Sequence, residues 1–347
     1  MREGLRLALP SKGMEEATLA FLASCGLAVD RTNPRQYRAS MPSLPGVGVL
    51  FQRANDIFAK VEEGSVDLGI TGYDVVQEHR GEDDPVVVLY PKLGYGRCAL
   101  VLAVPEAWID VTTVADLADV AASFRARGRE LRIATKYPNL TRRFLHEHAI
   151  AHFTIVESSG ALEAAPTLGY ADVVADLMTS GVTLRENRLK TIQGGIILES
   201  EACLIGNREA LRCSPEKRAL TRSMLELIEA YLRSRRYCRV TANVRSTSEA
   251  AVVRLITTHG EVAGLRGPTV ARVHPKVGGE DGWFGVTVVV DRGLLLKTVE
   301  VLRRAGASEI MVSPLTYVFE SKSWSYEALE RQLEAPPGEM EEWWERS

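Results

Sequence analysis

Short apolar runs alternate with segments of helical periodicity along the first two thirds of the chain. Residues 5–9 predict a strand, and residues 15–25 predict a helix that ends at Gly26, where a helix commonly takes its C-terminal cap. The same order continues further along. It predicts strands at 47–51, 66–70, 86–90 and 99–104, with a helix at 55–63. Such alternation is typical of an α/β fold.

The pattern restarts after Pro105 as a second α/β unit. It predicts strands at 131–134, 154–156 and 172–177, a helix that begins at 114–118, and further helices at 140–148, 161–169 and 184–189. The chain then returns as a strand at 196–205 and a long helix at 215–233. Two units of similar size, with the chain crossing back, predict two lobes with a cleft between them. Ligands of such sheets bind at the carboxyl ends of the strands.

From about Tyr237 the order of elements changes. Apolar periodicity predicts strands at 239–244, 269–273, 284–290 and 309–317, and helices at 247–258 and 293–305. This β-α-β-β-α-β order is the ferredoxin-like arrangement and predicts a separate small domain. The tail beyond Ser321 is acidic and contains Pro336-Pro337-Gly338. Trp343 and Trp344 favour a packing contact, so the tail is either a docked helix or partly disordered.

These patterns divide the chain into four parts. We expect a first lobe at 1–104 and 190–235, a second lobe at 105–189, a ferredoxin-like domain at 236–320 and an acidic tail at 321–347. A length of 347 residues agrees with about two or three domains, and a hydrophobic share of 46% is enough for sizeable cores.

The charge balance disfavours nucleic acid as a partner. With 42 basic and 45 acidic residues the net charge is −3, which gives no electrostatic reason to expect nucleic-acid binding. There is no run of about 18 apolar residues and no N-terminal signal core, so we expect a cytoplasmic protein without a membrane span. The five cysteines are an odd number without a CxxC pair, which supports neither a disulfide framework nor structural zinc.

The segment 173–184 carries the most informative candidate chemistry. A buried strand leads through Asp176 into the loop Thr179-Ser180-Gly181-Val182-Thr183 and then into a helix. A glycine turn with hydroxyls at a helix N-terminus offers N–H and O–H donors to a phosphate, without a Cβ to block close approach. Asp176 would then lie near the hydroxyls of a ribose. An ordinary strand-to-helix turn capped by Thr183 explains the same residues.

Basic side chains stand at the ends of several predicted strands. Lys12 lies in a glycine turn after the first strand, Arg53 follows the second, and Lys136 ends a later one. Arg142 and Arg143 lie in the first turns of a helix, where the helix dipole disfavours cations unless an anion binds there. A solvated basic face is the plainer account of these two arginines. Positive charge gathered at strand ends in a near-neutral chain indicates a polyphosphate ligand.

Taken in order, several motifs resemble the ATP phosphoribosyltransferase family over about residues 5–318. Each motif is modest by itself, whereas the set in this order is specific. The motifs are Leu9-Pro10-Ser11-Lys12-Gly13, Arg53 to Asp56-Ile57, Asp67-Leu68-Gly69-Ile70-Thr71-Gly72-Tyr73-Asp74, Tyr95-Gly96-Arg97-Cys98, Arg132-Ile133-Ala134-Thr135-Lys136-Tyr137-Pro138, Gly160-Ala161-Leu162-Glu163-Ala164-Ala165-Pro166 and Asp176 through Asn187. The segment Gly264 to Thr269, with Gly306-Ala307, is similar to the regulatory domain of the family's long form.

The resemblance implies an α/β catalytic part of two lobes, like those of type II periplasmic binding proteins, plus a C-terminal ferredoxin-like (βαββαβ) regulatory domain. It implies transfer of the 5-phosphoribosyl group of phosphoribosyl pyrophosphate to N1 of ATP, the first step of histidine biosynthesis. Its ligands would be ATP, phosphoribosyl pyrophosphate and Mg²⁺. Histidine would be a feedback inhibitor, and the assembly a homo-hexamer with no nucleic-acid or membrane partner.

The resemblance also implies roles for individual residues, and it assigns no metal ligands. The catalytic residues would be Lys12, Arg53 and Asp176. Phosphoribosyl pyrophosphate would contact Thr179, Ser180, Gly181, Val182, Thr183 and Glu163. The nucleotide would contact Asp74, Arg97, Lys136 and Tyr137. The chain departs from the family pattern in three places, namely Met14-Glu15, Val182 and the tail after Ser321.

Three other interpretations of the sequence are a two-lobe binding protein without catalysis, a nicotinamide dehydrogenase and an inactive regulatory paralogue. The missing signal peptide argues against the first. No GxGxxG follows the first strand, which argues against the second. Retention of Lys12 and of the loop that ends at Thr183 argues against the third.

Overall fold

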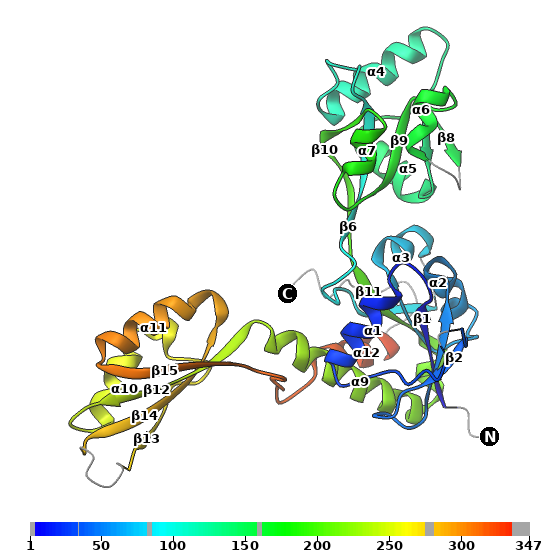
Figure 1. The fold of residues 1–347 in the computed structure, drawn as a ribbon. Helices are drawn as coiled ribbons and strands as arrows, with labels where there is room; N and C mark the ends of the chain where they lie inside the picture. The colour runs from blue at the N-terminus through cyan, green and yellow to red at the C-terminus, as the bar shows by residue number, and fades with distance from the viewer. Residues whose placement is uncertain (1–3, 34, 82–84, 158–161, 275–280, 335–347) are drawn as a thin grey trace. The chain divides into compact units, whose positions relative to one another are not determined.

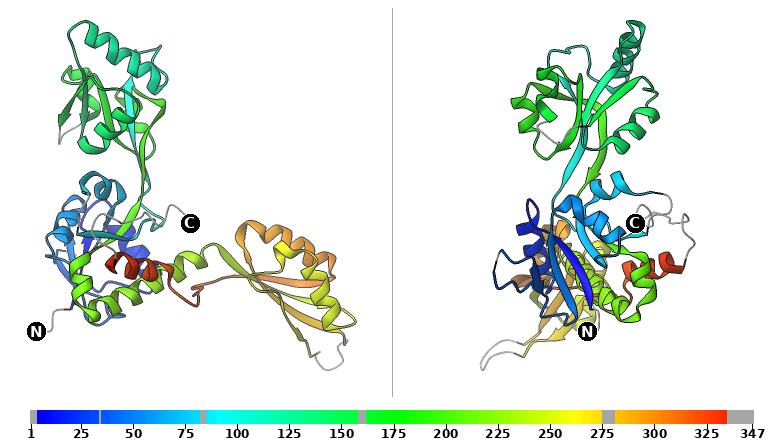
Figure 2. Two further views of the ribbon diagram at one scale, coloured as in Figure 1. Left: turned by 180° about the vertical axis from the view of Figure 1, so that it is seen from behind. Right: turned by 90° about the vertical axis from the view of Figure 1, so that its right-hand side faces the viewer.

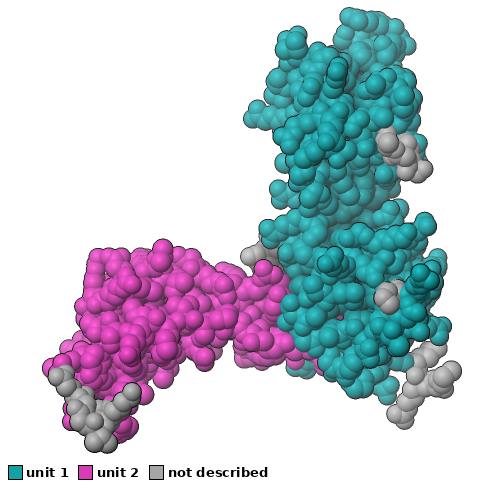
Figure 3. All heavy atoms as spheres, viewed as in Figure 1, with its two compact units in different colours: residues 1–222, 325–347 teal, residues 223–324 magenta. Residues whose placement is uncertain are grey.

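The computed structural model describes residues 4–33, 35–81, 85–157, 162–274 and 281–334. Its contacts divide the chain into two compact units, drawn in different colours in Figure 3. The larger unit takes in the chain up to Arg222 and the segment from Ser325 onward, and the smaller unit spans residues 223–324. The larger unit holds two β-sheets, and the smaller unit holds one.

The first sheet places the carboxyl ends of its two longest parallel strands side by side. Its strands are β1 (Leu5–Pro10), β2 (Arg38–Ser40), β3 (Val47–Gln52), β4 (Leu68–Gly72), β5 (Val86–Tyr90) and β11 (Ala202–Asn207), in the order β2-β3-β1-β4-β11-β5 (Figure 1). β1 is parallel to β3 and β4, whereas β11 runs antiparallel to β4 and β5. The accompanying helices are α1 (Glu15–Ser24), α2 (Ala54–Glu62), α3 (Tyr73–His79), α8 (Arg208–Cys213) and α9 (Pro215–Ser234).

The second sheet is mixed in the same way. Its strands are β6 (Cys98–Pro105), β7 (Leu131–Thr135), β8 (Phe153–Glu157), β9 (Val173–Met178) and β10 (Leu189–Ser200), in the order β10-β6-β9-β7-β8. β7 is parallel to β8 and β9, and β6 is antiparallel to β9 and β10. Its helices are α4 (Val114–Ala126), α5 (Pro138–Glu147), α6 (Ala165–Leu168) and α7 (Val182–Glu186), with a 3-10 turn, η1 (Leu162–Ala164).

Three expectations about this region are wrong. The helix expected at 184–189 ends at Glu186, because Arg188 has a φ of +55° and turns the chain out of the helix. The strand expected at 196–205 is in fact two strands, β10 and β11. β6 and β10 pair with each other in the second sheet, so residues 98–104 and 190–200 do not lie in the first sheet, where the expected lobe limits placed them.

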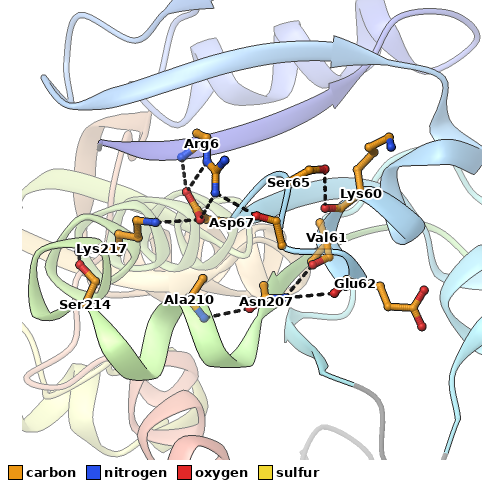
Figure 4. Close-up of polar contacts among 11 residues, drawn as sticks. Arg6, Lys60, Val61, Glu62, Ser65, Asp67, Asn207, Ala210, Ser214 and Lys217 are labelled. Carbon is orange, nitrogen blue, oxygen red and sulfur yellow. Dashed lines mark hydrogen bonds and ion pairs between the residues drawn. The ribbon is translucent and has the colours of Figure 1, made fainter. Parts of the chain in front are cut away.

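A buried aspartate ties β1 to β4 and to α9 (Figure 4). Asp67 is fully buried and accepts hydrogen bonds from the backbone N–H and the guanidinium of Arg6 and from the ammonium of Lys217, at 2.8–3.2 Å. Burial alone would raise the pKa of this carboxyl, but the bonds from Arg6 and Lys217 hold the pKa below its ordinary value. The Arg6 guanidinium also donates to the carbonyl of Gly64, three residues before Asp67.

The second lobe repeats this arrangement. Asp172 accepts from the backbone N–H and the guanidinium of Arg132 on β7, and the same guanidinium donates to the carbonyl of Gly169. The strand order β3-β1-β4-β11-β5 of the first sheet matches β8-β7-β9-β6-β10 of the second in spatial order and in the direction of each strand, although β11 comes last along the chain in its sheet and β6 comes first in its own. The two lobes are therefore two versions of one α/β unit, each fastened by an arginine–aspartate pair.

The smaller unit confirms the β-α-β-β-α-β order. Its sheet has the order β13-β14-β12-β15, with all neighbours antiparallel. Its elements are β12 (Tyr237–Arg245), α10 (Glu249–Thr257), η2 (Gly260–Val262), β13 (Thr269–Arg272), β14 (Trp283–Asp291), η3 (Arg292–Leu294), α11 (Leu295–Arg304) and β15 (Ala307–Pro314). Figure 2 shows both helices on one face of the sheet, where Val240 and Val288 pack with Ile256 and Leu302.

The start of the tail forms a helix, α12 (Trp324–Glu334), which belongs mainly to the larger unit. Ala328, Leu329 and Leu333 are buried, and the guanidinium of Arg222 in α9 lies over the ring of Tyr326. A docked helix was one of the two expectations for the tail. The other features noted there, the Pro-Pro-Gly segment and the paired tryptophans, lie outside the described residues. No helix in the described part of the chain combines the length and apolar character that a membrane crossing requires.

Candidate active site

A basic pocket of about 550 Å³ opens where β1 and β3 end. Lys12 and Arg53, both predicted from the sequence, lie in its wall. The two residues come together because β1 and β3 are parallel neighbours in register, with Pro10 opposite Gln52, so that both chains leave the sheet at one edge. The full lining is Ser11, Lys12, Glu15, Arg31, Arg35, Tyr37, Phe51, Gln52, Arg53 and Asp56.

Among the lining residues that were not predicted from the sequence are Arg31, Arg35 and Tyr37. They lie in the long connection between α1 and β3, and the ring of Tyr37 is 73% exposed. The Arg31 guanidinium is held in place, since it donates to Glu15 at 2.6 Å and lies 3.9 Å from the centre of the Phe51 ring. The sequence did contain a signal for these residues. The connection is longer than two adjacent strands require, and it carries two arginines and a tyrosine within seven residues.

In the second lobe, Lys136 and Glu163 both act electrostatically on Asp176. Burial raises the pKa of Asp176, the negative charge of Glu163 adds to the rise, and the ammonium of Lys136 opposes it. The backbone N–H of Leu177 donates to the Asp176 carboxylate at 2.8 Å. Lys136 follows the end of β7, Asp176 lies near the end of β9, and Glu163 lies in η1, so three different elements contribute these charges.

The loop Thr179–Thr183 has the conformation that a phosphate cradle requires at one position. Gly181 has a φ of +71°, in the left-handed region, and precedes α7. Thr179, Ser180 and Thr183 are exposed, and their hydroxyls have no hydrogen-bond partner among the described residues. Thr183 therefore caps no helix here, which the alternative interpretation as a plain capped turn would require. α7 has only five residues, so its dipole adds little.

Asp74 and Tyr137, expected at the nucleotide, lie buried against each other. Asp74 is 4% exposed and Tyr137 is 8% exposed. The Tyr137 hydroxyl donates to the Asp74 carboxylate at 2.6 Å. Burial, and then the nearby Asp74 carboxylate, raise the pKa of Tyr137 well above its usual range. Arg97, by contrast, is exposed and forms an ion pair with Glu201 at 3.3 Å.

The two arginines at the start of α5 have partners within the chain. The Arg143 guanidinium donates to the backbone carbonyl of Gln77 at 3.4 Å, and that of Arg142 donates to Asn139 at 3.4 Å. The anion at the N-terminus of α5 is the carboxylate of Glu78, so neither arginine has to be explained by a bound ligand. Gly160 and Ala161 of the sequence motifs lie outside the described residues.

Comparison with known proteins identifies the family of the chain. The family model for ATP phosphoribosyltransferase matches residues 53–230, and the model for the HisG C-terminal domain matches residues 234–317. The chain is 38% identical to ATP phosphoribosyltransferase 2, chloroplastic, of Arabidopsis thaliana, over 93% of this chain and 80% of that protein. It is 37% identical to ATP phosphoribosyltransferase of Bradyrhizobium diazoefficiens, over 94% of this chain and 98% of that protein. A solved ATP phosphoribosyl transferase (HisG:HisZ) complex from Thermotoga maritima matches 65% of this chain and 98% of the solved chain, at 24% identity and a TM-score of 0.49. The chain belongs to the ATP phosphoribosyltransferase family, in the form that carries a C-terminal domain.

Proposed function

We propose that this chain transfers the 5-phosphoribosyl group of phosphoribosyl pyrophosphate to N1 of ATP and releases pyrophosphate, the first step of histidine biosynthesis. Family membership supports the reaction. The observation that carries the assignment of the site is the pocket at the ends of β1 and β3, where four cations, Lys12, Arg31, Arg35 and Arg53, surround a space of about 550 Å³. Cations in forked or paired arrangements are what a polyphosphate requires.

The two lobes would share the two substrates. The loop Thr179–Thr183 would hold the 5′-phosphate of the ribose donor through backbone N–H groups and free hydroxyls. Asp176 and Glu163 would face the ribose hydroxyls, and Lys136 would lie beside them. The pocket with Lys12 and Arg53 would take the pyrophosphate and nucleotide phosphates.

The reaction is a displacement at the anomeric carbon of the ribose. The lone pair of adenine N1 forms the new C–N bond while the C–O bond to pyrophosphate breaks, and its electron pair leaves on the pyrophosphate oxygen. Positive charge develops on the ribose, and the Asp176 carboxylate would stabilise that charge. Lys12 and Arg53 would stabilise the negative charge of the departing pyrophosphate. N1 carries no proton to remove, so the chain needs neither a strong general base nor a covalent nucleophile. Catalysis then depends mainly on the positions of two polyanions.

Mg²⁺ would enter with the pyrophosphate. The described residues contain no group of three or more His, Cys, Asp or Glu side chains able to hold a metal ion. Mg²⁺ is usually bound by substrate phosphates together with one or two carboxylates. Asp176, three residues before the loop, and Glu163, which interacts with Asp176 electrostatically, would complete the coordination. When bound, Mg²⁺ supplies charge neutralisation for the leaving pyrophosphate.

The smaller unit would be the regulatory domain and histidine its ligand, with a homo-hexamer as the working assembly in the cytoplasm. This assignment rests on the match of the C-terminal domain family to residues 234–317 and on the ferredoxin-like sheet. Histidine titrated into the full chain should inhibit turnover, and light scattering should give the assembly in the same buffer.

The direct test is an assay with ATP, phosphoribosyl pyrophosphate and Mg²⁺ that follows the absorbance of phosphoribosyl-ATP and the release of pyrophosphate together. Both products should appear in equal amounts and only with both substrates present. Calorimetry with each substrate alone separates the alternatives. A chain that binds both ligands and yields neither product is a binding protein or a regulatory paralogue.

A further inference from the structure

Helix α3 of the first lobe forms several polar contacts with the start of α5 in the second lobe. Glu78, near the end of α3, is 4% exposed. Its two carboxylate oxygens accept the backbone N–H groups of Asn139 and Leu140, at 2.8 and 2.9 Å. A carboxylate from one lobe thus satisfies the helix N-terminus of the other.

The sequence at the start of α5 explains why it requires a partner from elsewhere. Tyr137 stands at the N-cap position but has no side-chain bond to the helix, and Pro138, the first helical residue, has no N–H. The next two N–H groups have no carbonyl to bind within their own helix. Glu78 supplies two acceptors and a negative charge where the helix dipole favours it.

The contact is reciprocal. The last carbonyls of α3 lack partners within that helix, as at any helix C-terminus. The side chain of Asn139 donates to the carbonyl of Glu78 at 3.0 Å, and Arg143 donates to that of Gln77 at 3.4 Å. Each helix end therefore caps the other, and the positive end of α5 meets the negative end of α3.

One turn earlier on α3, Asp74 makes a second connection between the lobes. Its carboxylate accepts from the Tyr137 hydroxyl and from the hydroxyl of Ser200 at the end of β10, both at 2.6 Å. Its backbone N–H donates back to the same serine oxygen at 2.9 Å. Asp74 and Glu78 are four residues apart, so they lie on one face of α3. A side chain at Gly72 would collide with the Asp74 carboxylate, which explains the glycine before this helix.

We propose that Asp74 and Glu78 are positioning residues that clasp residues 137–140 of the second lobe to α3 of the first. Lys136 directly precedes the clasped segment, and Asp176 lies within electrostatic reach of both Lys136 and Tyr137. The clasp therefore sets where the acid and the cation of the second lobe stand with respect to the basic pocket of the first. The catalytic consequence rests on the proposed function, whereas the clasp itself does not.

The test compares Glu78→Gln with Glu62→Gln, which changes an exposed glutamate on α2 in the same way. We expect Glu78→Gln to lower kcat by roughly 10- to 100-fold, the scale on which misplaced reacting groups reduce a rate. The dissociation constant of phosphoribosyl pyrophosphate, measured by calorimetry, should change less than kcat does, because the loop that would hold its 5′-phosphate is untouched. Glu62→Gln should match the unmodified chain in both measurements.

Hydrogen–deuterium exchange gives a readout that does not depend on turnover. Exchange of the amides of residues 139–141 should accelerate in Glu78→Gln and stay unchanged in Glu62→Gln, because the Glu78 carboxylate accepts the N–H groups of Asn139 and Leu140. If the unmodified chain transfers no phosphoribosyl group, the exchange result still decides whether the clasp exists. Unchanged exchange and unchanged kcat in Glu78→Gln overturn the proposal, as does a lowered melting temperature with normal kcat below it.

A second variant, Tyr137→Phe, covers the case in which Glu78→Gln does not fold. It removes one hydroxyl from Asp74 and keeps the ring that fills the space. The clasp predicts the same pattern, in which kcat falls by a larger factor than the affinity for phosphoribosyl pyrophosphate. Normal kcat in a folded Tyr137→Phe would contradict the role assigned to Asp74.

Discussion

At the scale of single residues, buried or partly buried carboxylates hold the larger unit together. Asp67, Asp74, Glu78 and Asp172 each accept hydrogen bonds from residues at least 40 positions away in the sequence. Acids with so little exposure are stable only where donors compensate the loss of water. The cations at the strand ends differ, because Lys12 and Arg53 are exposed at a pocket.

The exposed cations should matter for catalysis and little for stability. Lys12→Ala or Arg53→Ala should each lower kcat/KM by about 10- to 150-fold, which corresponds to about 1.5–3 kcal/mol for a lost hydrogen bond to a charged group. Melting temperatures should stay near that of the unmodified chain. Lys60→Ala, on α2 and outside the pocket, is the matched control. Wild-type kinetics in both pocket variants would place the polyphosphate elsewhere.

Asp67→Asn should destabilise the chain by about 3 kcal/mol, because it leaves the ammonium of Lys217 nearly buried without its carboxylate. Asp172→Asn, at the equivalent and more exposed pair, should cost only about 1 kcal/mol. Urea unfolding of both variants measures the difference. Equal losses of unfolding free energy in the two variants would show that the difference in burial does not set how much each ion pair stabilises the chain.

The stability supplied by Asp67 should also depend on pH. Because the folded state lowers the pKa of Asp67, its contribution is complete above the unfolded value of about 3.9 and is lost as the pH falls through the lower folded value. The gap in unfolding free energy between the unmodified chain and Asp67→Asn should therefore shrink in that acidic range. A gap that stays constant down to the acid limit of folding would contradict the lowered pKa.

At the scale of elements, the ends of strands and helices decide the chemistry. β1 and β3 deliver the pocket residues, β7 and β9 deliver Lys136 and Asp176, and α3 and α5 cap each other. Most predicted elements have bounds within a few residues of the observed ones, because apolar periodicity records which faces are buried. The short edge strand β2 was missed, since three residues carry too little periodicity.

The loop before α7 should bind the donor rather than cap the helix. Gly181→Val should impair phosphoribosyl pyrophosphate binding far more than ATP binding, because the residue has a φ of +71° and its Cβ would lie 3.3 Å from the sulfur of Met178. Thr183→Ala should cost less, about 0.5–1.5 kcal/mol of donor affinity. Calorimetry of each ligand, with a melting curve, measures both. Normal donor affinity in folded Gly181→Val would leave the loop a structural turn.

At the scale of the whole molecule, the chain leaves the larger unit through α9 and comes back to it as α12. The returning segment is bonded to the second half of α9, where Val318 donates to the carbonyl of Ala230 and the Ser234 hydroxyl donates to that of Thr316. The chain therefore links the smaller unit to the larger unit at two points. A truncation that removes the smaller unit and all that follows it also removes α12 and its apolar contacts.

Deleting residues 238–347 should abolish inhibition by histidine and also lower the melting temperature, because Ala328, Leu329 and Leu333 of α12 leave with the domain. Deleting only residues 323–347 isolates the second effect and should retain inhibition in folded protein. Turnover with and without histidine, together with light scattering, follows both variants. A folded 238–347 deletion that histidine still inhibits would remove the regulatory assignment.

The sequence by itself determined the local choices: the α/β alternation, the βαββαβ order, the cations at strand ends and the glycine loop after Asp176. These follow from periodicity and turn chemistry, which act over a few residues. Only the tertiary structure decided which distant groups meet. Arg31 and Tyr37 join the pocket because a long connection folds over β3. Asp74 and Glu78 are occupied by partners about 60 or more positions away, because parallel strands and helix ends bring together residues that no local pattern relates.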